Sequence, residues 1–190
     1  MINFIKANRF LFSCLTIIFL SSFVASLVQS SFTKVEIELK ELKTDNGQSL
    51  IYDLYKPKTA NKDNKVPFVI VVPGFQRSKE ALSNIAIELS RRGMAVALID
   101  PYAQGMSSSS VSRIAATTQG YGMFALVDHA YDGNFSFVDT EKIASTGHSM
   151  GGNAAIRGAD YFGKQAIKEN RESKLPVSYT HLTLPTKRIV

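Results

Sequence analysis

The sequence predicts an α/β fold: a mostly parallel sheet with helices on both faces, preceded by an N-terminal hydrophobic segment. Residues 68–72 (FVIVV) form a continuous β-branched apolar run, which is typical of a strand buried on both faces of a parallel sheet. A stretch with helical periodicity follows, and two more strand-then-helix pairs come after it. Strands and helices that alternate along the chain indicate a parallel sheet with helices packed on its faces.

The first half of the chain supplies a hairpin, a strand and a helix. Residues 34–42 alternate apolar and charged side chains, and residues 49–57 follow a TDNG turn, which predicts an antiparallel hairpin. After the strand at residues 68–72, the spacing predicts a helix with Ser78 as its N-cap and Gly93 just past its end.

The second half continues the alternation. Residues 94–100 read as a buried strand, residues 112–131 as a helix, and residues 142–146 as a strand that leads into a glycine- and alanine-rich helix. Ligand sites in such sheets lie at the carboxyl ends of the strands. The sequence places three connections there: the loop after Val72, the loop after Asp100 and the turn at Ser149.

Charge and composition exclude some classes of partner. The 190 residues suffice for one domain with a substantial core, and the net charge of +6 would allow a nucleic-acid or anionic partner. Without residues 1–30 and 177–190, however, 18 basic face 16 acidic residues, so no nucleic acid is expected. Neither a metal ion nor a cofactor is expected.

The N-terminus has the pattern of an export signal. Lys6 and Arg9 precede an uncharged, mostly apolar run over residues 10–28, and small residues ending at Ser26 or Ser30 offer cleavage sites. The run is also long enough to stay in a bilayer as an anchor. Residues 1–30 are therefore predicted to be a signal peptide or a membrane anchor, and both alternatives place the domain outside the cytoplasm.

A motif for nucleophilic catalysis follows the third parallel strand. The segment Gly147-His148-Ser149-Met150-Gly151 fits the pattern G-x-S-x-G, in which a serine occupies a strained turn between a strand and a helix. Gly147 and Gly151 keep side chains from colliding across that turn. The apolar strand before the motif and the small-faced helix after it are the context that the motif requires.

With these features, residues 34–163 resemble the α/β-hydrolase superfamily, and the phrases SLIYDLYKP, VPFVIVVPGF and IASTGHSMGG most resemble its dienelactone-hydrolase-like and acetyl-esterase-like branch. True dienelactone hydrolases carry a cysteine nucleophile, whereas this chain has Ser149. The resemblance therefore implies hydrolysis of a small-molecule carboxylic ester through an acyl-enzyme on Ser149.

The resemblance also implies roles for residues around the serine. It places an oxyanion hole at the backbone N–H groups of Phe75 and Met150, and Gln76 is a candidate lining residue of the acyl pocket. Asp100, which begins a phrase similar to the family's D-x-R-G-x-G-x-S, is expected to shape its loop. His148 adjoins the nucleophile on a sharp turn and is expected to be a packing or pocket residue, and His129 a surface residue of a helix.

The other members of a catalytic triad are not evident in the chain. After Ser149 come only Asp160, Glu169 and Glu172 as acids and His181 as a base, and no acid follows a further strand as the fold requires. Residues 177–190 fit neither an amphipathic helix nor the next strand, and they resemble a translated sequencing adapter. Residues 31–176 are therefore predicted to be a truncated hydrolase domain, residues 177–190 a non-native tail, and the fragment inactive.

Two other functions remain open at this stage. The chain could come from a non-catalytic α/β-hydrolase-like binding protein that kept the serine turn and lost the other groups. Alternatively, the same triad could serve peptidase or acyltransferase chemistry.

Overall fold

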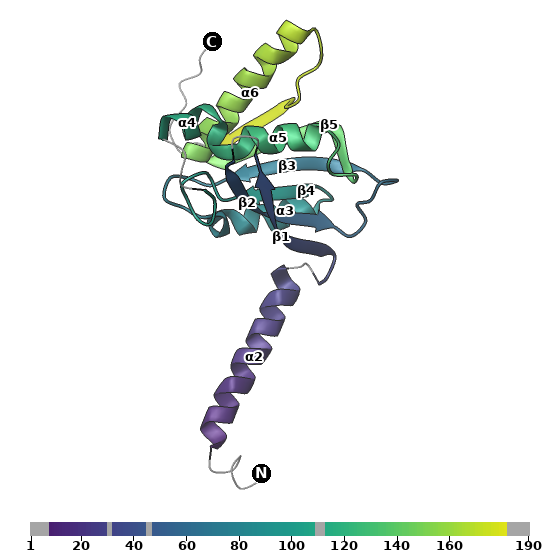
Figure 1. Ribbon diagram of the computed structural model, residues 1–190. Helices are drawn as coiled ribbons and strands as arrows, with labels where there is room; N and C mark the ends of the chain where they lie inside the picture. Colours follow the sequence, from purple (N-terminus) through teal and green to yellow (C-terminus); the bar gives the residue numbers. More distant parts are fainter. Residues whose placement is uncertain (1–7, 30–31, 45–46, 109–112, 182–190) are drawn as a thin grey trace.

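The computed structural model describes residues 8–29, 32–44, 47–108 and 113–181. Its centre is a six-stranded sheet in the order β1-β2-β4-β3-β5-β6, with helices on both faces (Figure 1). Strands β1 (Val35–Lys43) and β2 (Ser49–Pro57) form the expected antiparallel hairpin. The next three strands are β3 (Val66–Val72), β4 (Ala95–Ile99) and β5 (Val138–His148). They run parallel to one another, while β2 is antiparallel to β4, so the sheet is mostly parallel as predicted.

Two groups of buried side chains, one on each face, hold the helices to the sheet. On one face, residues such as Val71 and Leu98 pack with Ala86 of helix α3 (Ser83–Arg91). On the other face, Phe68 and Ile70 belong to the larger cluster, which also includes residues of α5 (Met123–Tyr131) and α6 (Met150–Glu169). Because alternate residues of one strand enter different clusters, β3 is buried on both sides, as its unbroken apolar run predicts.

The helix after β3 begins differently from the prediction. Ser78 lies at the N-cap position, but of a short 3-10 helix, η1 (Lys79–Leu82), and its side chain caps no backbone group. The backbone N–H of Lys79 donates instead to Asp100 Oδ1, at 2.8 Å. A carboxylate from the end of β4 thus replaces the local serine cap, and a tertiary contact of this kind leaves no mark in the local sequence.

The prediction of a single helix over residues 112–131 is wrong, because this stretch forms three separate helical parts. These are α4 (Arg113–Thr118), the 3-10 turn η2 (Gly120–Gly122) and α5; residue 112 lies outside the described residues. Tyr121 and Gly122 both have positive φ, 57° and 98°. A Cβ at Gly122 would lie 2.6 Å from Leu50 Cδ1, so close packing on β2 bends the chain here.

The expectation that residues 177–190 contain no strand is also wrong. Residues Val177–His181 form strand β6, which pairs in parallel with β5. Valine, tyrosine and threonine favour extended backbone, and β5 provides the N–H and C=O groups with which the segment pairs. The origin of residues 177–190 stays a prediction, and residues 182–190 lie outside the described residues.

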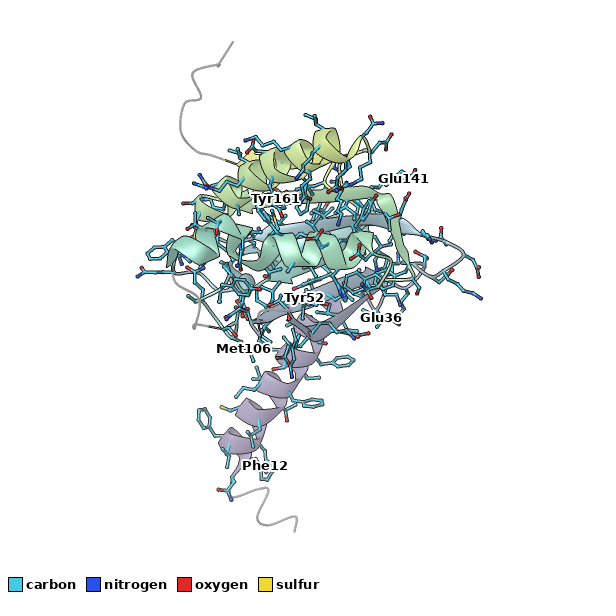
Figure 2. All side chains as sticks on the ribbon, turned by 45° about the horizontal axis from the view of Figure 1, so that its top comes forward. Phe12, Glu36, Tyr52, Met106, Glu141 and Tyr161 are labelled. Atoms are coloured by element: carbon cyan, nitrogen blue, oxygen red, sulfur yellow. The ribbon has the colours of Figure 1, made fainter. Side chains whose placement is uncertain are left out.

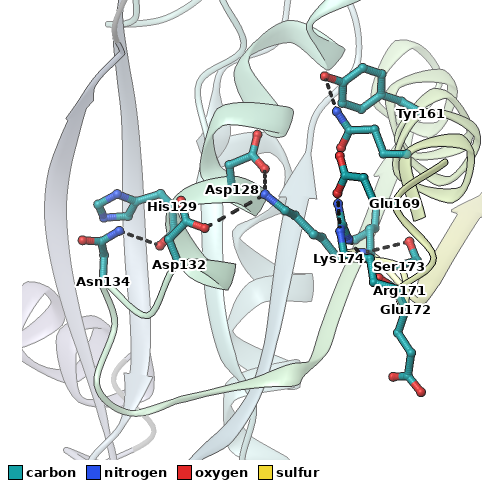
Figure 3. A network of polar contacts seen from close by, with 12 residues as sticks. Asp128, His129, Asp132, Asn134, Tyr161, Glu169, Arg171, Glu172, Ser173 and Lys174 are labelled. Carbon is teal, nitrogen blue, oxygen red and sulfur yellow. Dashed lines mark hydrogen bonds and ion pairs between the residues drawn. The ribbon is translucent and has the colours of Figure 1, made fainter. Parts of the chain in front are cut away.

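The segment between α6 and β6 is fastened to α5 by the polar contacts of Figure 3. The ammonium of Lys174 lies 2.6 Å from Asp128 Oδ1 and 5.1 Å from the centre of the Tyr131 ring, near the end of α5. A cation at a helix C-terminus is favoured by the helix dipole. Leu175 follows and is buried in the larger core cluster. The domain therefore includes the chain at least as far as Leu175.

Helix α2 (Arg9–Gln29) extends away from the domain (Figures 1 and 2). Its side chains, of which Phe12 is labelled in Figure 2, are mostly exposed, and none of its apolar stretch Arg9–Val28 is buried. By length and composition this helix is able to cross a membrane, and an N-terminal signal sequence has the same properties.

Candidate active site

Ser149 occupies a sharp turn between β5, which ends at His148, and α6, which begins at Met150. Its backbone has φ 53° and ψ −114°, a conformation that costs a residue with a side chain about 1–3 kcal/mol. The Ser149 carbonyl already accepts the Asn153 N–H at 3.0 Å, so the residue caps the helix while its side chain is exposed. This is the strained strand-to-helix turn that the motif predicts.

Two glycines make the turn possible. A Cβ at Gly147 would lie 2.5 Å from both the carbonyl oxygen of Val72 and the carbonyl carbon of Gly151. A Cβ at Gly151 would lie 2.6 Å from the carbonyl carbon of Val72. The start of α6 therefore rests directly on the end of β3, as predicted for both glycines. This contact places Ser149 at the carboxyl edge of the sheet.

The loop after β3 approaches the serine from the side. A Cβ at Gly74 would lie 3.5 Å from Ser149 Cβ and 3.1 Å from His148 Nδ1, so the loop touches the turn. Phe75, the predicted oxyanion-hole residue, has half of its surface exposed (51%) and lines the pocket in front of Ser149. Met150, the second such residue, also lines it. As the first residue of α6, Met150 has a backbone N–H without an acceptor inside the helix.

Gln76 does not line this pocket, contrary to expectation. It borders a second hollow, which shares Phe75, Ala103 and Gln104 with the pocket, and its backbone has φ 56°. Its N–H donates to the side-chain oxygen of Gln104. This bond holds the Gln76 backbone toward the loop after β4.

The carboxylate of Asp100 shapes the loop after β4, as expected. The side chain is buried, and its two oxygens accept the N–H groups of Lys79 and Met106, at 2.8 and 3.0 Å. The Asp100 carbonyl accepts the hydroxyl of Ser107 at 2.7 Å. Asp100 therefore fastens the β4 loop to the segment that follows the β3 loop, and it is not among the residues that line the pocket.

The three connections enclose a pocket of about 750 Å³. Its lining comes from the loops after β3 and β4, from α4 and η2, and from the first two turns of α6. The lining residues are mostly apolar or aromatic: Phe75, Tyr102, Ala103, Gln104, Ala116, Thr117, Tyr121, Ser149, Met150, Asn153, Ile156 and Arg157. The three connections that the sequence places at the carboxyl edge of the sheet thus meet around one pocket.

The lining, as far as the structure describes it, contains no carboxylate and no imidazole. The acids considered from the sequence lie elsewhere: Asp160 pairs with Lys164 on α6, and Glu169 pairs with Arg171. Glu172 belongs to the segment after α6, and its carbonyl accepts a bond from Arg171. His181 pairs by its main chain with His148. None of the three carboxylates belongs to the described pocket lining beside Ser149.

The remaining histidines differ in their surroundings. His148 is exposed next to Gly74 and is absent from the pocket lining. His129 is half-buried on α5, with its ring edge-on to Phe135 at 5.0 Å, so the expectation of a plain surface histidine is wrong. Burial lowers the pKa of His129 below its usual value, although Asp132 acts in the opposite direction. Neither histidine belongs to the described pocket lining.

Sequence reasoning missed Gln104. Its side-chain amide bonds three backbone groups of the β3 loop and lies in the pocket lining. A glutamine in a polar loop carries no local signal for this role, because its partners are about 30 residues away in the sequence.

No protein-family model matches the chain, and the search among curated proteins found no match. Solved structures do match. The α/β hydrolase GrgF from Penicillium sp. sh18 aligns at 24% identity over 76% of this chain and 45% of its own, with a TM-score of 0.58. A bacterial heroin esterase aligns at 18% identity over 86% of this chain and 49% of its own, with a TM-score of 0.58.

A third structure, DcsB in complex with its substrate analogue, aligns at 28% identity with a TM-score of 0.55. The alignment covers 65% of this chain and 41% of DcsB. The chain thus spans less than half the length of the structures that it matches. The strand order, the helices on both faces and these matches agree: the chain has the α/β-hydrolase fold.

Proposed function

We propose that the chain is part of a serine hydrolase that cleaves carboxylic esters through an acyl-enzyme on Ser149. The observation that carries the proposal is the backbone of Ser149, held at positive φ between β5 and α6 with its side chain exposed beside a pocket. Such strain in a residue other than glycine is expensive and is concentrated at functional sites. The esterases among the matched structures support the same class of reaction.

The proposed reaction has two steps. The Ser149 oxygen attacks the ester carbonyl while its proton passes to a base, and the base returns the proton to the departing alcohol. Water then cleaves the acyl-enzyme and regenerates the serine. The N–H groups of Phe75 and Met150 would stabilise the negative charge that develops on the carbonyl oxygen, where one donor contributes about 3 kcal/mol.

The base and the acid that orients it belong, in this proposal, to a part of the protein outside the described residues. The described pocket lining supplies neither, and the chain spans less than half of each matched structure. The mostly apolar walls suit the uncharged acyl or alcohol part of an ester. Nothing in the described site favours peptidase or acyltransferase chemistry over ester hydrolysis.

A fluorophosphonate probe tests the proposal. The full-length protein that contains this sequence should be labelled on Ser149, located by peptide mass spectrometry, and should hydrolyse p-nitrophenyl esters. The Ser149→Ala variant is the matched control and should lose both properties. A folded full-length protein that is neither labelled nor active would favour the alternative, a binding protein with a hydrolase fold.

We further propose that the hydrolase works outside the cytoplasm. Helix α2 is apolar and unburied, and Lys6 and Arg9 precede the uncharged run over residues 10–28, which favours translocation of the C-terminal part. N-terminal sequencing of the exported protein distinguishes a cleaved signal from an anchor. Retention of the protein in the cytoplasmic fraction would contradict the proposal.

A further inference from the structure

The side-chain amide of Gln104 joins the two loops that frame Ser149. Its oxygen accepts the N–H of Gln76, and its nitrogen donates to the carbonyl oxygens of Gly74 and Arg77, each at 3.3 Å. All three partners are backbone groups of the loop after β3. An amide carries an acceptor oxygen and a donor nitrogen on the same carbon, so it satisfies both kinds of backbone partner at neutral pH, where a carboxylate only accepts.

These bonds fix the peptide groups on both sides of Phe75. The Gly74 carbonyl and the Phe75 N–H belong to one planar trans peptide, so they point in opposite directions. Holding the carbonyl at Gln104 therefore fixes the direction of the Phe75 N–H. The bond to the Gln76 N–H fixes the next peptide in the same way.

The loop that carries Gln104 is itself held firmly. The Ala103 N–H donates to Ser108 O at 2.8 Å, and the Asp100 carboxylate accepts the Met106 N–H. Ala103 and Gln76 have positive φ, 64° and 56°, one in each loop beside the amide. Residues other than glycine keep such conformations only where their surroundings fix them, so the contact between the loops holds both in a defined geometry.

We propose that Gln104 is a positioning residue of the active site: its amide holds the Phe75 N–H in the orientation that stabilises the oxyanion. The inference rests on the proposed ester hydrolysis. It adds a residue of the β4 loop that acts through the β3 loop and makes no bond to the reacting atoms. Loss of the amide leaves the pocket in place and leaves the Gly74 carbonyl with its bond from the Arg77 N–H, at 3.2 Å. The Gly74–Phe75 peptide is then held less firmly, so the transition state loses more than the bound substrate does.

The isosteric variant Gln104→Glu tests this proposal in the full-length protein. Its carboxylate still accepts the Gln76 N–H but has no proton to donate to Gly74 and Arg77. We expect kcat for p-nitrophenyl esters to fall about 10- to 100-fold with KM within about 3-fold, and the affinity for a boronic acid transition-state analogue to fall by a similar factor. Lower pH should raise the ratio of variant to wild-type activity, because the protonated carboxyl donates again.

Two further variants complete the design. Gln104→Met removes both kinds of bond at similar length and should show the same split between kcat and KM without the pH effect. Gln165→Met removes a glutamine bond on α6, to Tyr161, outside the pocket and should leave kcat unchanged. Thermal melts show whether each variant is folded.

The outcomes separate the two proposals. Labelled wild-type protein with both Gln104 variants at wild-type kcat overturns the role of Gln104 alone. A change confined to KM, or a loss of activity in step with a loss of folded protein in both variants, also overturns it. Wild-type protein that remains unlabelled overturns the proposed hydrolysis and this inference together.

Discussion

Gly151 and Val72 lie in contact through their backbones: a Cβ at Gly151 would lie 2.6 Å from the carbonyl carbon of Val72 and closer still to its oxygen. The atoms that this Cβ would meet are backbone atoms at the end of β3, and Gly151 itself lies in the first turn of α6. Neither side of the contact is a flexible side chain that could move away. The turn at Ser149 and the central strand are therefore fitted to each other without room for a methyl group.

Gly151→Ala is expected to destabilise the protein by about 3 kcal/mol or more, because the new methyl group meets backbone that cannot yield. The matched control is Gly163→Ala on the same helix, where an added Cβ meets nothing within 4 Å. That substitution should stabilise the protein by about 0.5–1 kcal/mol. Urea unfolding measures both, and equal effects would show that the close contact is absent.

Lys79→Met should destabilise the protein by about 3 kcal/mol. The ammonium is nearly buried (side chain 6% exposed), 2.9 Å from the exposed Glu80 and 3.6 Å from the partly buried Asp53, and its removal leaves the Asp53 carboxylate without its cation. Lys164→Met breaks an exposed pair with Asp160 and should change stability by about 0.5 kcal/mol or less. A similar small effect at Lys79 in urea unfolding would contradict the burial of this group.

His129 should make stability depend on pH below neutrality. Because burial lowers its pKa in the folded protein below the ordinary 6.5, the unfolded chain binds a proton first as the pH falls. The stabilisation is present above pH 6.5 and declines toward the lowered pKa. NMR titration should show the low pKa, and His129→Phe, which keeps a ring against Phe135, should flatten this part of the curve. A pKa at or above 6.5 would refute it.

The 190-residue chain alone should show no Ser149-dependent turnover of p-nitrophenyl acetate, since the described pocket lining has no base to take the serine proton. Ser149→Ala gives the background rate. The main chain of His181 lies beside His148, so His181→Gln is the second control. Turnover that requires both Ser149 and His181 would contradict the expectation that the fragment is inactive.

The sequence was sufficient for elements whose pattern is local. The run at residues 68–72 predicted β3, and the glycines around Ser149 predicted the turn, because periodicity and conformational limits act over a few residues. The sequence did not predict local structure that depends on contacts between residues far apart in the chain. Leu50 of β2 packs where the helix predicted over residues 112–131 breaks, and Asp100 caps the helix for which Ser78 was expected.

The same limit applies to the site. That Ser149, Phe75 and Met150 share a pocket could be predicted, because parallel strands bring their carboxyl ends together. That Gln104 bonds the β3 loop could not, because a one-residue change in loop length would send its side chain elsewhere. The partly buried ring of His129 depends similarly on Phe135, which belongs to the turn after α5.

Strand β1 is the last strand on one side of the sheet, and this position affects how molecules of the protein meet. The unpaired N–H and C=O groups of an edge strand can pair with a strand of another molecule, and repeated pairing of this kind leads to aggregation. Along β1, charged residues alternate with the exposed Ile37 and Leu39; Glu38 and Lys40 form an ion pair, and Glu36 pairs with Lys56 of β2. A strand from another molecule would have to dehydrate these charges, so the alternation that predicted the strand also disfavours pairing at this edge.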